Sequence, residues 1–199
     1  MSGSRVIAFF DFDGTITTKD IFGDFIRYRL KNGLSKNRII QCLPVMLLYT
    51  CRLITNSTAK KRVFSKLFKG TKEGDFKKWA DYYSSNILPS YLRKSAIQQI
   101  EWHKAEGHEV FIVSANFDLI LQPFASLNEV GVISTELEIF NGLLTGNFAT
   151  PNCYGIEKVT RIKKLFDLEA YSSTYAYGDS NGDTDMLMLA TNKFYRYFT

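Results

Sequence analysis

A short apolar run that stops at a pair of carboxylates most strongly constrains what this chain can fold into. Residues 6–10 (VIAFF) are all apolar, and residues 11–15 (DFDGT) follow at once. A continuous apolar run of this kind is typical of a strand that is buried on both faces of a parallel sheet. The pattern therefore predicts a first strand that leads into a functional loop at its carboxyl end.

The rest of the chain alternates between helical and strand patterns. A helical stretch at about 89–106 precedes the strand pattern EVFIVSAN (109–116), and a helix from about residue 155 precedes the strand pattern STYAYGDS (173–180). A short helix, DTDMLMLA, and a last strand, KFYRYF, follow these elements. The alternation predicts an α/β fold with a Rossmann-like open parallel sheet.

Polar side chains stand where three of the predicted strands end. Asp11, Ser114 and Asp179 each close one strand pattern, although they are far apart in the sequence. In open parallel sheets, ligands bind beyond the carboxyl ends of the strands. We therefore expect the fold to bring these three residues together at one edge of the sheet.

Two regions interrupt the alternation. Residues 17–85 show a helical pattern without a convincing strand, which predicts a helical cap inserted after the first strand. Residues 132–150 contain an Asn-Gly pair flanked by β-branched and aromatic residues, which predicts a β-hairpin. The predicted core domain therefore comprises residues 1–16 and 86–199, and the predicted cap domain comprises residues 17–85.

Composition indicates a folded protein of a reducing compartment. The 199 residues are 45% hydrophobic, which suffices for one sizeable domain with an insertion. The cysteines are odd in number and widely spaced, which disfavours a disulfide framework and a zinc site: Cys42, Cys51 and Cys153. The longest uncharged apolar stretch, residues 39–51, is interrupted by Pro44 and shorter than the about 20 residues that span a bilayer. With no signal-peptide pattern, we expect a cytoplasmic protein without a transmembrane helix.

Asp11 and Asp13 form the first candidate catalytic pair. Their spacing lets both carboxylates address one ligand. A carboxylate next to a divalent cation can attack phosphorus, and a second one can protonate the leaving oxygen and later deprotonate water. A surface turn also favours Asp and Gly, but the buried strand before the pair favours the catalytic interpretation.

Candidate phosphate ligands lie at the end of the second strand pattern and in the helical pattern that precedes the third. Ser114, Ala115 and Asn116 offer a hydroxyl and successive backbone N–H groups, although a serine at this place is also a common helix cap. Lys158 opens the helical pattern KVTRIKKLF and can stabilise a phosphoryl group by its charge. Lys163 and Lys164 are nearby alternatives for this role.

Asp179 and Asp183 complete a candidate magnesium site. Mg²⁺ prefers about six oxygen ligands and keeps several waters, so a few carboxylates from separate loops suffice. Asp179 is predicted as a direct ligand. Asp183 is predicted either as a ligand or as a neighbour that orients the ligands.

The motifs DFDGT, IVS, a lysine and GDSNGD, in this order, resemble the four motifs of the haloacid dehalogenase superfamily over essentially the whole chain. The resemblance implies that Asp11 is the nucleophile and forms an aspartyl-phosphate, and that Asp13 is the general acid/base. It also implies that Ser114 and Lys158 bind phosphate. Mg²⁺ would be held by Asp11, the backbone carbonyl of Asp13 and Asp179. Dehalogenases of the superfamily lack the second aspartate, so the resemblance implies a phosphatase.

Within the superfamily, the helical insertion is similar to the phosphoserine phosphatase-like subfamily IB. Asp20 stands where phosphoserine phosphatases carry a glutamate for the substrate's amine, and the lysine lies three residues after Gly155 instead of just before a glycine. The stretches GTITTKD and CYGIEKV resemble a neighbouring bacterial branch that includes phosphatidylglycerophosphate phosphatases. The resemblance therefore implies a phosphoserine-like small molecule or a phospholipid headgroup phosphate as substrate, with Asp20 near it.

The predicted cap is strongly basic. Between residues 25 and 72 stand twelve Lys/Arg and no Asp/Glu, so this segment carries +12 while the rest of the chain carries −7. Seven of the twelve fall within 21 positions and alternate with apolar residues at helical spacing: Arg52, Lys60, Lys61, Arg62, Lys66, Lys69 and Lys72. The pattern fits a solvated helix face, and it also fits attraction to a polyanionic substrate or, peripherally, to an anionic membrane.

Two further functions use the same features. A phosphotransferase that passes the phosphoryl group to an alcohol would need the same residues. A non-catalytic protein could bind nucleic acid through the basic cap, but the intact carboxylate set argues against this, and we expect no nucleic-acid partner. The sequence makes no prediction about the oligomeric state.

Overall fold

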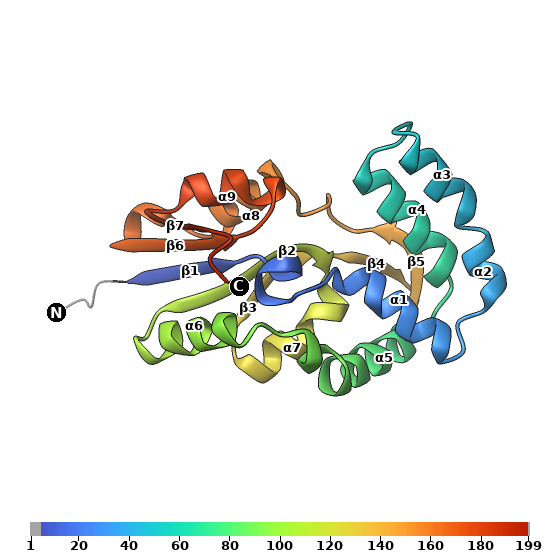
Figure 1. Cartoon of the computed structure of the whole chain (residues 1–199), viewed down its shortest axis with the longest axis horizontal. Coiled ribbons are helices and arrows are strands. Elements are labelled where there is room, and N and C mark those ends of the chain that lie inside the picture. The colour runs from blue at the N-terminus through green and yellow to red at the C-terminus, as the bar shows by residue number, and fades with distance from the viewer. Residues whose placement is uncertain (1–4, 199) are drawn as a thin grey trace.

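A five-stranded parallel sheet forms the centre of the molecule in the computed structural model, which describes residues 5–198 (Figure 1). The strand order is β3-β2-β1-β6-β7. The sheet contains β1 (Val6–Phe10), β2 (Glu109–Phe117), β3 (Gly131–Thr135), β6 (Ser173–Gly178) and β7 (Asn192–Tyr195). The predicted α/β fold with an open parallel sheet is therefore confirmed.

Helices cover both faces of this sheet. In Figure 1, α8 and α9 lie above the strands, and α6 and α7 lie below them. The bounds of these four helices are α6 (Lys94–Ala105), α7 (Asp118–Asn128), α8 (Ile156–Leu165) and α9 (Thr184–Leu189). Short turns of 3₁₀ helix join them to their neighbours: η2 (Leu88–Tyr91), η3 (Leu168–Ala170) and η4 (Asn181–Asp183).

The first strand explains why both faces need a cover. Ala8 and Phe10 point into one buried cluster, whereas Ile7 and Phe9 point into the other. Successive side chains of a strand face opposite sides of the sheet. The residues of the continuous apolar run therefore enter the two buried clusters alternately. All four side chains are at most 1% exposed.

Five of the helices between β1 and β2 lie in the stretch predicted as a cap, and the last of them extends one residue beyond it. They are α1 (Ile21–Lys31), α2 (Lys36–Ile40), α3 (Leu43–Thr50), α4 (Asn56–Phe68) and α5 (Glu73–Asn86). An irregular helical turn, η1 (Phe12–Ile16), connects β1 to this region. Phe64 of α4 packs on Phe117 of β2 with 4.8 Å between ring centroids, within one large buried cluster. The division into domains at residues 17 and 85 stays a prediction, and residues 1–4 and 199 of the predicted core lie outside the described residues.

The region predicted as a hairpin contains more than a hairpin. Its first residues belong to β3, which pairs in parallel with β2 in the main sheet. The antiparallel hairpin itself consists of β4 (Leu137–Phe140) and β5 (Leu143–Phe148), joined at the predicted Asn141-Gly142 turn. Both turn residues have positive φ, as a tight hairpin turn requires. The hairpin lies against the end of α4, where the Gly70 N–H donates to the Leu144 carbonyl at 2.8 Å.

Within residues 5–198, no helix has both the length and the apolar character needed to cross a bilayer.

His103 of α6 is a buried titratable group beneath the sheet. It is 0% exposed, and its ring nitrogens share hydrogen bonds with the Tyr177 hydroxyl at 3.0 Å and with His108 at 2.8 Å. Burial, with a smaller contribution from His108, lowers the pKa of His103 to about 4. The unfolded chain therefore binds a proton at this histidine between about pH 6.5 and pH 4, whereas the folded protein does not.

This difference predicts a pH-dependent stability. As the pH falls from 7.5 to 4, His103 should lower the free energy of unfolding by about 3 kcal/mol. We expect the stability difference between the wild type and His103→Gln to shrink by that amount, as measured by urea denaturation across this range. Carboxylates titrate in both proteins and cancel in the difference. A difference that stays constant would show that folding does not lower the pKa of His103.

Candidate active site

Asp11 follows the last residue of β1 at the carboxyl edge of the sheet. Its backbone N–H donates to the Tyr177 carbonyl of β6 at 2.9 Å, so the two central strands hold its position. The residue is buried, and burial raises the pKa of its carboxyl group to about 6 in spite of a neighbouring lysine. A buried carboxylate at this edge is well placed to meet a ligand.

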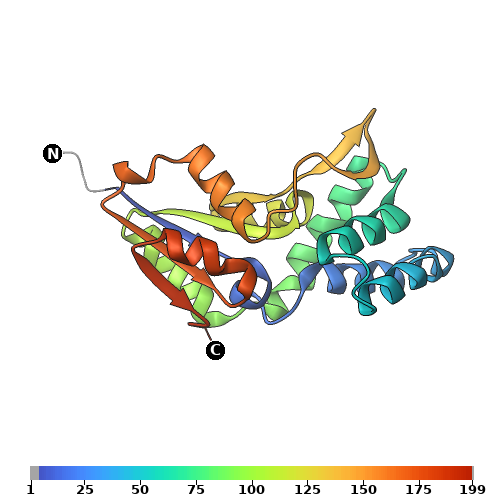
Figure 2. The same ribbon diagram turned by 90° about the horizontal axis from the view of Figure 1, so that it is seen from above.

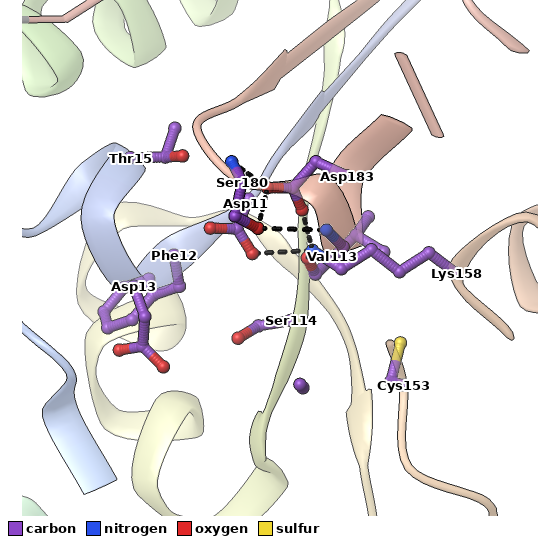
Figure 3. Close-up of polar contacts among 12 residues, drawn as sticks. Asp11, Phe12, Asp13, Thr15, Val113, Ser114, Cys153, Lys158, Ser180 and Asp183 are labelled. Atoms are coloured by element: carbon purple, nitrogen blue, oxygen red, sulfur yellow. Dashed lines mark hydrogen bonds and ion pairs between the residues drawn. The ribbon is translucent and has the colours of Figure 1, made fainter. Parts of the chain in front are cut away.

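Lys158 is that neighbouring lysine, and it links two carboxylates (Figure 3). Its ammonium donates to Asp11 Oδ1 at 2.6 Å, to Asp183 Oδ1 at 2.6 Å and to the Val113 carbonyl at 2.7 Å. Burial alone would lower the pKa of Lys158, but the two carboxylates outweigh it and raise the pKa above its usual value. Lys158 is therefore charged at neutral pH, and it lies 1% exposed beside the predicted nucleophile.

The two alternative lysines lie elsewhere. Lys163 and Lys164, in the last turn of α8, are exposed. Neither lines the cavity that contains Asp11, whereas Lys158 does. The geometry therefore favours Lys158 among the three predicted candidates.

Three carboxylates form a cluster that fits a divalent cation. Asp11, Asp179 and Asp183 each offer an oxygen, and these oxygens all lie within 4.8 Å of one another. The backbone of Gly14 has a φ of +90° and passes so close to Asp179 that a β-carbon at this position would overlap its carboxylate. A hard-oxygen donor set of this kind suits Mg²⁺. Thr15 donates to Asp179 Oδ1 at 3.2 Å and fixes its orientation.

Asp183 is more heavily engaged by the protein than Asp179. Its Oδ1 accepts the bond from Lys158, and its Oδ2 accepts the backbone N–H of Ser180 at 3.0 Å and the Ser180 hydroxyl at 2.8 Å. The Asp179 N–H also donates to Oδ2 at 3.2 Å. These bonds favour the second of its two predicted roles, in which Asp183 orients the groups around a cation.

Asp13 faces the same cavity from the turn after β1. Its carboxylate accepts the Ile21 N–H at 2.9 Å and the side-chain amide of Asn116 at 3.2 Å. Burial raises the pKa of Asp13 to about 7, and the nearby charge of Asp20 adds to the effect. A carboxyl group with a pKa near neutrality can both give and take a proton under physiological conditions.

The predicted phosphate ligands of β2 divide into two kinds. Ser114 and Ala115 line the cavity, and the Ser114 side chain is 1% exposed. Asn116 is fully buried and does not line the cavity: its amide donates to Asp13, and its N–H donates to the Ser114 hydroxyl oxygen at 3.0 Å. The strand continues to Phe117 and the next helix begins at Asp118, so Ser114 is not a helix cap.

Asp20 and Lys60 reach the cavity from the helical region. Asp20 caps α1 by accepting the Gly23 N–H at 3.0 Å. Lys60 of α4 donates to the Ala115 carbonyl at 2.6 Å and lies 4.7 Å from the centre of the Phe117 ring. The sequence indicated Lys60 only as one member of a basic face. No local signal marks it, because its position depends on how α4 packs over β2.

The cavity itself has a volume of about 370 Å³. The polar residues described above line it together with apolar side chains of the helical region: Phe22, Ile26, Met46, Tyr49, Ala59 and Val63. Sequence reasoning could not place these side chains, since they come from three separate helices.

Comparisons with known proteins agree with this arrangement. Residues 8–188 match the family model of haloacid dehalogenase-like hydrolases. Protein CicA of Caulobacter vibrioides is 32% identical over 200 aligned positions, covering 100% of this chain and 89% of CicA. A histidinol-phosphatase of Neisseria meningitidis is 24% identical over 196 positions, covering 93% of this chain and 87% of that protein.

Solved structures show the same fold. A Bordetella pertussis protein of unknown function has a TM-score of 0.81 at 23% identity, covering 94% of this chain and 88% of that one. A substrate-bound phosphoserine phosphatase has a TM-score of 0.67 at 18% identity, covering 98% of this chain and 87% of that one.

Proposed function

Because this chain belongs to the haloacid dehalogenase-like hydrolase family, we propose that it hydrolyses phosphomonoesters through an aspartyl-phosphate on Asp11. One observation carries the proposal: Asp11 lies 2.6 Å from the buried Lys158 in a cavity that Asp13 also lines. In the proposed reaction these residues would act as nucleophile, charge stabiliser and proton donor, and their proximity supports the proposal. The phosphatase name of the Neisseria relative supports the same reaction class.

We propose Mg²⁺ as the cofactor. Asp11, Asp179 and the backbone carbonyl of Asp13 would hold the ion, while Asp183 keeps Lys158 and the Ser180 loop in position. The cation would offset the repulsion between the phosphate and the Asp11 carboxylate.

In the first half of the reaction, a carboxylate oxygen of Asp11 attacks phosphorus and forms an acyl-phosphate bond. The bond between phosphorus and the leaving oxygen breaks, and Asp13 gives its proton to that oxygen. Ser114 and Lys158 contact the phosphoryl oxygens and stabilise their charge. Asn116 and the Ile21 N–H hold the Asp13 carboxyl group in place for this transfer.

In the second half, Asp13 accepts a proton from a water molecule as that water attacks phosphorus. The acyl-phosphate bond breaks, which restores the Asp11 carboxylate and releases inorganic phosphate. The same residue thus serves first as acid and then as base, which requires a pKa near the working pH. Burial raises the pKa of Asp13 to about 7 and so supports this role.

The residues that line the cavity also indicate which kind of leaving group it accepts. Most of the lining from the helical region is apolar, and Lys60, which donates to the Ala115 carbonyl, is the positive group that this region contributes. We propose a leaving group with an apolar body and a negative charge within reach of Lys60. Phosphate release from a panel that contains phosphoserine, sugar phosphates, nucleotides and a phosphatidylglycerophosphate tests this, because only the last combines both features. Highest activity on sugar phosphates would contradict it.

Metal removal provides a direct test of the carboxylate cluster. EDTA should abolish hydrolysis of an aryl phosphate, and excess Mg²⁺ should restore it. Asp179→Asn should raise the Mg²⁺ concentration for half-maximal activity about 100-fold, since an amide replaces a charged ligand. The exposed Asp185 of α9 offers the matched control, because Asp185→Asn should leave the Mg²⁺ requirement unchanged. Full activity in EDTA would rule out the metal.

A further inference from the structure

The helical region exposes several large apolar side chains of α2, α3 and the segment directly after α3. We call this set the α2–α3 surface: it comprises Ile40 (59% exposed), Leu43 (61%), Met46 (47%), Leu47 (64%), Tyr49 (38%) and Leu53 (70%). Figures 1 and 2 show α2 and α3 at the end of the molecule that lies farthest from the strands β6 and β7. Only Val45 of α3 is buried, although the helix is apolar along nearly its whole length. Large apolar clusters of this kind mark sites of interaction.

The same stretch of chain also exposes basic residues. Lys36 belongs to α2, Arg52 directly precedes Leu53, and Lys31, Lys61 and Arg62 belong to α1 and α4; all five are exposed. The segment from residue 25 to residue 72 contains no acidic residue at all. The complementary partner is therefore an apolar phase bordered by negative charge.

We infer that the α2–α3 surface docks on an anionic lipid bilayer. An apolar helix with flanking lysines and arginines binds in the interface plane, where its side chains enter the acyl boundary and its charges meet the headgroups. With eight residues, α3 is too short to cross the bilayer and fits an interfacial position. A second copy of the chain fits less well, because its own α2–α3 surface would bring the same positive charges face to face.

The α2–α3 surface and the cavity share two residues. Met46 and Tyr49 belong to α3, and both also line the cavity that contains Asp11. A molecule docked through α3 would therefore have its cavity mouth at the lipid interface. This inference goes beyond the proposed reaction, because it holds or fails whatever the phosphate ester is.

The chain contains a native position for a reporter group. Cys51, directly after α3, is exposed, whereas Cys42 and Cys153 are buried. A polarity-sensitive fluorophore on Cys51 should shift to the blue when vesicles of phosphatidylcholine with about 30 mol% phosphatidylglycerol are added at low salt. Lipids with a quencher in the acyl chain should quench it. Pure phosphatidylcholine vesicles should give a much smaller change.

Variants of the surface separate docking from catalysis. Leu47→Glu together with Leu53→Glu should weaken co-sedimentation with the anionic vesicles at least about 10-fold, because each leucine loses its transfer into the apolar phase. Leu127→Glu is the matched control, since Leu127 of α7 is 77% exposed and lies outside the α2–α3 surface. The wild type, the double variant and the Leu127→Glu control should all hydrolyse a soluble aryl phosphate at the same rate. Docking and catalysis are thus measured separately: a wild type that binds vesicles but does not hydrolyse the ester would contradict the proposed reaction and leave the docking inference intact.

Three results would overturn the inference. The first is a wild-type protein that does not bind the anionic vesicles. The second is equal vesicle binding by the wild type and the double variant. The third is a wild-type dimer, seen by light scattering without lipid, that the double variant converts to a monomer, because this would assign the surface to a second copy of the chain.

Discussion

Asp11→Asn is expected to lower phosphate release from an aryl phosphate by at least about 10⁴-fold, because an amide cannot form the acyl-phosphate. The substitution keeps the shape of the side chain and an oxygen that can accept the bond from Lys158, which lies 2.6 Å from the carboxylate. The fold should therefore persist, and circular dichroism and thermal unfolding can verify this. Phosphate release under saturating substrate and Mg²⁺ is the measurement.

The matched control and a trapping experiment sharpen this test. Asp185→Asn replaces an exposed aspartate of α9 and should retain full activity. Asp13→Asn should still phosphorylate Asp11 slowly while losing the proton transfers, so a rapidly quenched mixture should contain a phosphorylated peptide with Asp11. Turnover by Asp11→Asn above about one hundredth of the wild-type rate would refute this residue as the nucleophile.

Lys158→Met is expected to destabilise the protein by about 3–5 kcal/mol, in addition to removing activity. The ammonium is 1% exposed and contacts both Asp11 and Asp183 at 2.6 Å, so its loss leaves two buried carboxylates without their shared partner. Urea denaturation in EDTA measures this free energy without a cation that could take the place of the lysine.

Lys164→Met supplies the comparison for this variant. Lys164 lies on the same helix but is exposed, so its replacement should change the free energy of unfolding by less than about 0.5 kcal/mol. Equal stability of the two variants would mean that the buried ion network contributes nothing to folding. Equal activity of Lys158→Met and Lys164→Met would mean that Lys158 is not the lysine that binds the phosphoryl group.

The sequence predicted the central part of the fold because its signals are local. An apolar run that ends at Asp11 and a second that ends near Ser114 each define a buried strand, and parallel strands align their carboxyl ends at one edge. The observed cluster of Asp11, Asp179 and Asp183 follows from these rules. The long separation of Asp11 and Asp179 in the sequence does not weaken the prediction, because the order of the strands in the sheet determines how far apart the two residues lie.

The remaining parts of the site depend on packing that no local pattern specifies. Asn116 contacts Asp13 because β2 continues past Ser114, and the Ser-Ala-Asn pattern is equally compatible with a helix start. Lys60 is indistinguishable in sequence from Lys61, yet only Lys60 faces the cavity, because α4 is rotated with Phe64 toward β2. Likewise, β3 was included in the hairpin prediction because a short β-branched run does not reveal its partner strand.

Aromatic contacts hold the helical region against the sheet. Phe22 and Phe64 lie 4.9 Å and 4.8 Å from Phe117, measured between ring centroids, and all three side chains are nearly or fully buried. Swinging the helices away as a lid would expose these rings to water, at a cost of several kcal/mol. These ring contacts therefore oppose a swing of α1 and α4 away from β2, and we expect the helical region to stay packed over the cavity.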